Sequence, residues 1–91
     1  MDFGYKEEEL VEVLDDVADI KDLMVFNDDV NTFDHVIDTL VRVCNHSVEQ
    51  AEQCAYIIHF KGKCSVKRGL LKTLKPMQEA ICDEGIDARV I

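Results

Sequence analysis

The chain is organised around one stretch, Leu23-Met24-Val25-Phe26-Asn27-Asp28-Asp29. Its four apolar residues are typical of a strand, and three polar residues follow before a helical pattern begins at Phe33. Asn and Asp gather at turns because their side chains bond nearby backbone groups and tolerate left-handed φ. The stretch therefore predicts a strand over residues 23–27 and a turn into a helix. A second interpretation stays open, in which the side-chain oxygens stand at the rim of a site.

Two helices are expected after this turn. The first begins after an N-cap at Asn31 or Thr32 and continues through Cys44, with apolar residues on one face. Asn45-His46 interrupts that pattern, and Ser47 with Gln50 forms a capping box for the second helix. The buried positions of the second helix are Val48, Ala51, Cys54, Ala55 and Ile58, and its end is at Gly62. A connection of two or three residues predicts that the two helices are antiparallel or steeply crossed neighbours.

The remainder of the chain supplies a strand, a third helix and a closing strand. Residues 63–68 alternate as a strand, and Gly69 is expected to turn the chain. The third helix either begins near Thr73 with Pro76 in its first turn or is kinked at Pro76. Gly85 ends it, and residues 86–91 alternate as a closing strand. The order β-α-α-β-α-β predicts an α+β two-layer sandwich, in which a three-stranded antiparallel sheet packs against three helices.

Charge divides the chain into two parts. The 91 residues carry a formal net charge of −9, and residues 1–22 hold nine Asp and Glu against two Lys. We expect residues 1–22 to be an acidic arm, flexible or loosely helical, and residues 23–91 to be the core domain. The acidity disfavours nucleic acid and anionic membranes as partners. With neither a secretory signal nor an 18-residue apolar run visible, we expect a cytoplasmic protein.

Little in the sequence indicates an enzyme or a metal protein. There is no Gly-rich phosphate loop, no nucleophile elbow and no zinc-type cysteine spacing, so we expect no catalytic residue, no cofactor and no metal. The four cysteines are expected to be reduced core residues. One alternative stays open, a thiol or metal protein that uses Cys54, His59 and Cys64.

His59 lies in the last turn of the second helix, between apolar neighbours. A lone histidine there is often a boundary residue, but the second helix can end beside the exit of the first strand. His59 would then share a rim with Asn27 and Asp29, over a pit that is lined by Val25, Phe33, Val36 and Ala55. Such a rim and pit suit a free peptide N-terminus, whose ammonium group has three donors and whose bulky side chain fills the pit.

Two segments resemble the signatures of a known family. Phe26-Asn27-Asp28-Asp29 and Ile58-His59-Phe60-Lys61-Gly62-Lys63 are similar to those of the ClpS adaptors, and the resemblance covers residues 23–91. It implies an adaptor for N-degrons, which are N-terminal degradation signals: the adaptor binds proteins whose N-terminal residue is Phe, Leu, Tyr or Trp. The adaptor delivers them to the N-terminal domain of a Clp-family AAA+ unfoldase for degradation. By position, Asn27, Asp29 and His59 would hold the α-amino group. The side-chain pocket would be lined by Val25, Asn31, Phe33, Val36, Ala55 and Ile86.

The chain also departs from the family pattern. Asn31-Thr32 and Phe33 stand where the family has Thr-Pro and Met, and Ala55 stands where a Met is usual. Amine recognition therefore carries over better than side-chain preference. The alternative is a ClpS-like interaction module that binds the unfoldase but has lost or altered N-degron recognition. Residues 60–78 hold six Lys and Arg and no acidic residue, which makes them either a solvated face or a docking site for the unfoldase. A monomer fits a one-site adaptor.

Overall fold

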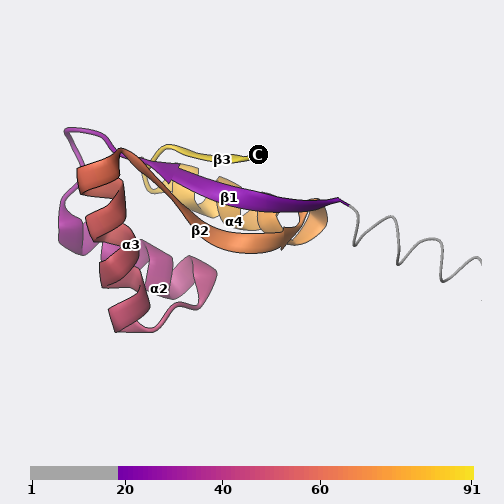
Figure 1. The fold of residues 1–91 in the computed structure, drawn as a ribbon, viewed down its shortest axis with the longest axis horizontal. Helices are drawn as coiled ribbons and strands as arrows, with labels where there is room; N and C mark the ends of the chain where they lie inside the picture. The colour runs from indigo at the N-terminus through magenta and orange to yellow at the C-terminus, as the bar shows by residue number, and fades with distance from the viewer. Residues whose placement is uncertain (1–18) are drawn as a thin grey trace, which may run out of the picture.

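The computed structural model of the protein describes residues 19–91 (Figure 1). Its sheet has the order β2-β1-β3, in which β1 (Ile20–Phe26) lies between β2 (Lys63–Leu70) and β3 (Ala88–Val90) and is antiparallel to both. Helices α2, α3 and α4 complete the order β-α-α-β-α-β. This arrangement confirms the predicted α+β fold with a three-stranded antiparallel sheet and three helices. The acidic arm predicted for residues 1–22 lies outside the described residues except for its last four.

The central strand is longer than its apolar residues indicate. Leu23 and Val25 point into the core and are fully buried, but β1 begins at Ile20, three residues before the expected start. Pairing with β2 explains the extension, because Ile20 is opposite Leu70 and Lys21 is opposite Gly69. The turn predicted at Gly69 is therefore wrong. Backbone pairing with a neighbouring strand overrides the turn preference of a glycine.

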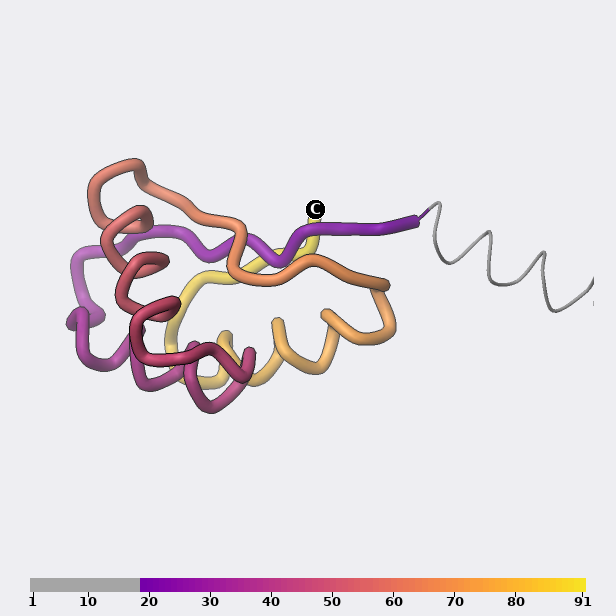
Figure 2. The backbone as a smooth tube through the Cα atoms, turned by 60° about the horizontal axis from the view of Figure 1, so that its bottom comes forward, coloured from indigo at the N-terminus to yellow at the C-terminus, as the bar shows by residue number. Residues whose placement is uncertain are grey.

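Helices α2 (Phe33–Cys44) and α3 (Val48–Lys61) begin and end where their caps predict. The Thr32 hydroxyl accepts a hydrogen bond from the backbone N–H of His35, and the Ser47 hydroxyl accepts one from that of Gln50. Asn45 ends α2 in the left-handed conformation with φ 57°. These caps make the connection short, so α2 and α3 pack against each other at the end of the sheet where β1 finishes (Figure 2).

Helix α4 (Leu71–Asp83) lies along one face of the sheet, as Figures 1 and 2 both show. It begins at Leu71, so the first of the two alternatives, a start near Thr73 with Pro76 in the first turn, is wrong, and Pro76 lies in the second turn of the helix. Pro76 lacks the N–H that would bond to the carbonyl of Lys72. Burial compensates for this loss, because Leu74 and Ile81 are both fully shielded from solvent against the sheet.

The strands and helices enclose one continuous core. Its members come from the inward face of the sheet, from all three helices and from the loop between α4 and β3: Leu23, Val25, Leu40, Cys44, Ala51, Cys54, Ile58, Cys64, Val66, Leu74, Ile81, Ile86 and Ala88. β3 is shorter than the expected strand over 86–91, although backbone hydrogen bonds join Asp22 to Ile91 in both directions beyond its end. None of the helices in residues 19–91 is both long and apolar enough to span a membrane.

Candidate functional site

The turn after β1 is held by the carboxylate of Asp28. Its Oδ1 accepts hydrogen bonds from the backbone N–H groups of Val30 at 2.8 Å and Asn31 at 2.7 Å. Its Oδ2 accepts a third hydrogen bond, from the side-chain Nδ2 of Asn31 at 2.6 Å. These donors, first of all the Asn31 backbone N–H, lower the pKa of Asp28 below its ordinary value. Asp28 is therefore the turn residue that the sequence predicts, and its oxygens are occupied within the turn.

Asn31 extends this turn to a distant part of the chain. Its Nδ2 also donates to the carbonyl of Gly85 at 2.9 Å, beyond the end of α4. One turn further along, His35 Nε2 donates to the carbonyl of Glu84 at 2.8 Å. These contacts fasten the first turn of α2 to the loop between α4 and β3, so the segment after β1 has a fixed position.

A backbone hydrogen bond joins the end of β1 to the end of α3. The N–H of Asn27 donates to the carbonyl of Gly62 at 2.8 Å, and Gly62 ends α3 with φ 91°. The last turn of α3, which carries His59, therefore lies beside the exit of β1. This is the proximity of Asn27 and His59 that the sequence analysis expects.

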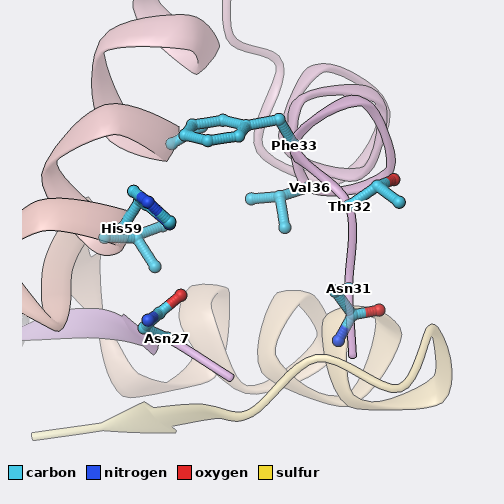
Figure 3. A pocket seen from close by; sticks show the side chains of 8 residues that line it. Asn27, Asn31, Thr32, Phe33, Val36 and His59 are labelled. Atoms are coloured by element: carbon cyan, nitrogen blue, oxygen red, sulfur yellow. The ribbon is translucent and has the colours of Figure 1, made fainter. Parts of the chain in front are cut away.

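A small cavity lies between the end of β1, the start of α2 and the last turns of α3 (Figure 3). Figure 3 shows Asn27 and His59 on one side of it, Val36 and Asn31 on the other, and the ring of Phe33 across the gap above. Its volume is about 30 Å³, which is far below the several hundred Å³ of most sites that enclose a small molecule. The lining residues are Asn27, Asn31, Thr32, Phe33, Val36, Ala55, Ile58 and His59.

Six of the nine expected site residues line this cavity, and three do not. Val25 and Ile86 are buried among core residues instead, at 0% and 3% exposure. Asp29 is exposed on the turn, two residues beyond Asn27. Thr32 and Ile58 also line the cavity, although neither is among the nine expected site residues. Thr32 was expected only as a cap and Ile58 only as a core residue, and no sequence signal separates those roles from a place in the cavity wall.

Three polar side chains at or near the cavity each offer an acceptor and have no partner within residues 19–91. The side-chain amide of Asn27, the ring nitrogens of His59 and the carboxylate of Asp29 make no hydrogen bond or ion pair there. The segment from residue 27 to residue 34 holds three aspartates and no cationic side chain. This arrangement favours a cationic hydrogen-bond donor at the mouth of the cavity.

Four aromatic rings adjoin the cavity. The rings of Phe33 and His59, which line it, have centroids 5.1 Å apart. Phe33 also contacts Tyr56 at 5.4 Å, and His59 contacts Phe60 at 4.9 Å. The ring nitrogens of His59 have no hydrogen-bond partner within the described chain. Packing against Phe33 and Phe60 therefore orients its ring.

Burial keeps the thiols of Cys54 and Cys64 protonated. All four thiols are free, and burial raises the pKa of Cys54 to about 12. Burial also raises the pKa of Cys64, so both thiols are protonated at neutral pH. Within residues 19–91 no group of three or more His, Cys, Asp or Glu side chains is placed to hold a metal ion. The geometry gives no support to a thiol or metal centre at Cys54, His59 and Cys64.

The fold and the cavity together define a small α+β domain in which a pocket of mixed polar and apolar lining lies between the end of β1 and helices α2 and α3. A model of the ClpS family, described as ATP-dependent Clp protease adaptor protein ClpS, matches residues 21–86. The chain therefore belongs to the ClpS family of Clp protease adaptors, as the two signature segments predict.

Solved structures agree with this family on the fold. Eighteen of their chains match this chain. One of them is Agrobacterium tumefaciens ClpS2 bound to L-phenylalaninamide, with a TM-score of 0.68 and 16% sequence identity. That match covers 80% of this chain and 95% of the ClpS2 chain. No curated protein sequence matches significantly.

Proposed function

We propose that this adaptor binds proteins by a bulky hydrophobic N-terminal residue and delivers them to a Clp-family AAA+ unfoldase for degradation. One observation carries the proposal: unpartnered acceptors on Asn27 and His59 edge a cavity whose other walls include Phe33, Val36, Ala55 and Ile58, with the free carboxylate of Asp29 close by in the chain. The ligand of the related ClpS2 structure supports it, because L-phenylalaninamide combines a free α-amino group with a benzyl side chain.

The α-amino group is the part of the substrate that the rim would recognise. A protonated amine has three N–H donors, which Asn27, Asp29 and His59 can accept through an amide oxygen, a carboxylate and an imidazole nitrogen. Each hydrogen bond to a charged group contributes about 1.5–3 kcal/mol. A bulky apolar side chain that leaves water adds about 2–3 kcal/mol. After the losses of association, these terms give an affinity near the micromolar range.

The side chain of the substrate requires the cavity to widen. A volume of about 30 Å³ holds little more than one or two water molecules, so one wall has to move. Phe33 is the wall best able to move, because it is the first residue of α2 and is 37% exposed. Val36, Ala55 and Ile58 belong to helix interiors and form the fixed part of the pocket.

The partner in delivery is proposed to be the N-terminal domain of the unfoldase. The family description supports an assembly with a Clp protease, and the basic residues of the segment from residue 60 to residue 78 suit an acidic patch on that partner. Three of these basic residues already have partners: Lys67 donates to the carbonyl of Cys44, Arg68 pairs with Asp22, and Lys72 also has a polar interaction. Lys61, Lys63 and Lys75 are exposed and are the better candidates for docking. We propose that the adaptor works as a monomer in the cytoplasm.

The rim is tested by two charge-matched substitutions, Asp29→Asn and Asp34→Asn. Asp29→Asn removes the charge proposed to hold the amine, so binding of a fluorescent peptide with a free N-terminal Phe should weaken roughly tenfold or more. Asp34 is exposed in the first turn of α2, outside the cavity lining, so Asp34→Asn should change the affinity by less than about twofold. Fluorescence anisotropy measures both affinities. Equal losses for the two variants would contradict a specific role for Asp29.

The narrow cavity favours one second candidate function. In this alternative, Phe33 keeps the pocket closed, and the domain is an interaction module that binds the unfoldase without recognising N-degrons. The same titration separates the two functions. A module of this kind would not bind the Phe peptide in its wild-type form, and Asp29→Asn would leave capture of the unfoldase unchanged.

A further inference from the structure

Two large aromatic side chains of α3 are exposed beside the cavity. Phe60 is 73% exposed and Tyr56 is 58% exposed, and the two follow each other at a spacing of one helical turn. Their rings are stacked, with centroids 6.0 Å apart and planes within 5° of parallel. The Tyr56 hydroxyl has no hydrogen-bond partner in the described chain. The pair, here called the Tyr56–Phe60 platform, therefore presents an apolar surface to solvent.

The platform is continuous with the cavity wall. Tyr56 contacts Phe33, and Phe60 contacts His59 edge to face with an interplanar angle of 86°. Phe33 and His59 contact each other and line the cavity. The four rings form a closed cycle in which two face the cavity and two lie outside it. A chain that places its first residue in the cavity therefore has the platform within reach of its next residues.

We propose that the Tyr56–Phe60 platform is a second subsite, which binds an apolar or aromatic side chain at the second or third residue of the bound protein. This inference depends on the proposed function, since it needs the N-terminal residue in the cavity. Consecutive Cα atoms lie 3.8 Å apart, so the second and third residues remain within one or two ring diameters of the rim. In an extended chain, alternate side chains face the same surface, and the backbone geometry decides which of the two contacts the platform.

The size and charge of the platform support this occupant. Two rings offer far less area than the roughly 800 Å² that each partner buries in a stable protein interface, but they suit one or two side chains of a peptide. Residues 53–60 of α3 contain no Asp, Glu, Lys or Arg, so the surface selects apolar contact over charge. Apolar residues following the N-terminal residue should thus bind more tightly than glycine.

The test uses three peptides with a free N-terminal Phe, continuing Gly-Gly, Leu-Gly or Gly-Leu before a common tail. Wild-type protein should bind the better leucine peptide roughly two- to tenfold more tightly than the Gly-Gly peptide. In Phe60→Ala and in Tyr56→Ala, this ratio should fall toward one. Ile57→Ala is the matched control, because Ile57 is 41% exposed on the same helix and takes no part in the ring contacts. That variant should keep the wild-type ratio.

Each ratio compares the affinities of two peptides for the same variant, so a change in the rim that affects both peptides equally cancels. A wild-type ratio of one, or a wild-type ratio that survives both aromatic substitutions, would overturn the subsite while leaving the proposed function intact. The proposed function fails separately, through absence of binding or equal binding of the acetylated Gly-Gly peptide. If Phe60→Ala instead abolishes capture by the unfoldase N-terminal domain and leaves the peptide ratios unchanged, the platform belongs to the partner and the proposal is overturned.

Discussion

At the turn after β1, the neighbouring residues Asp28 and Asp29 have different hydrogen-bonding environments. Asp28 accepts three hydrogen bonds from the backbone and side chain of the residues that follow it, whereas Asp29 makes none within residues 19–91. The side chain of Asn31 also donates a hydrogen bond to the carbonyl of Gly85, which connects this turn to the loop after α4. Asp28 thus positions the segment that carries Asn27 and Asp29, while its charge adds to the negative potential around the cavity.

Substitution Asp28→Asn tests this positioning role. It should lower the free energy of unfolding by about 1–2 kcal/mol at pH 7, because hydrogen bonds to a charged acceptor become bonds to a neutral one. The folded-state pKa of Asp28 lies below its ordinary value of 3.8, so its stabilisation is present above that pH and is lost as the pH falls through the folded pKa. Urea unfolding of both proteins at several pH values between 7 and 3 should show the difference shrinking only below about pH 4. A difference that is unchanged at pH 3 would contradict the charge-based explanation.

At the residue scale, the sequence predicts the polar rim and the cavity wall equally well, because two of the three expected rim residues and four of the six expected wall residues line the cavity. Asn27 and His59 are marked by their position after an apolar run and within a family signature, and both line the cavity. Val25 does not, since the alternation of β1 turns it with Leu23 into the core. Ile58 does, because the final turn of α3 faces the core and the cavity together. The packing of α2 against α3 decides which residues of their buried faces line the cavity. That packing cannot be predicted from a single sequence.

Among the elements, the junction of α3 and β2 sets the geometry of the site. Gly62 ends α3 with its N–H bonded to the carbonyl of Ile58, and its own carbonyl receives the N–H of Asn27. Its φ of 91° lies in the left-handed region, which residues with a Cβ adopt only at a cost. This one residue ends the helix, starts the strand and holds the rim of the cavity together.

Gly62→Ala should therefore destabilise the protein by about 1–2 kcal/mol, although the added methyl group meets open space. Gly69→Ala is the matched control. Gly69 lies within β2 at negative φ, and a Cβ there would be 3.8 Å from a methyl group of Leu74, which is an ordinary contact. That substitution should change stability by less than about 0.5 kcal/mol. Thermal unfolding of the two variants measures the contrast, and equal losses would argue against conformational strain at Gly62.

Some local sequence preferences are overridden by contacts between distant elements. Helix caps at Thr32, Ser47 and Gly62 are predicted because each cap is a local interaction. Gly69 is expected to turn the chain, and Pro76 either to lie in the first turn of a helix or to kink it, but β1 supplies a pairing partner for Gly69. The sheet supplies a surface against which α4, which contains Pro76, packs. Local preferences of this size are readily outweighed by long-range pairing and burial.

At the scale of the whole molecule, the order of elements was predictable because each one carries its own period and its own boundary residues. The beginning of β1 was not, since Ile20, Lys21 and Asp22 continue an acidic segment and join the sheet only through their partners in β2. Most of the formal charge of −9 also belongs to that N-terminal segment. Residues 23–91 are closer to neutral, with acidic side chains near the cavity and basic ones along the segment from residue 60 to residue 78. The basic segment begins beside the cavity, because Lys61 and Lys63 flank Gly62, whose carbonyl accepts the N–H of Asn27.

The central claim is that the cavity and its rim recognise a protonated N-terminus with a bulky side chain. Isothermal titration at pH 7 should compare one Phe-initiated peptide in two forms, with a free and with an acetylated N-terminus. The free form should bind near the micromolar range, and acetylation should abolish measurable binding because it removes the charge and two of the three donors. Equal affinity of the two forms, or no binding of either, would contradict amine recognition at this site.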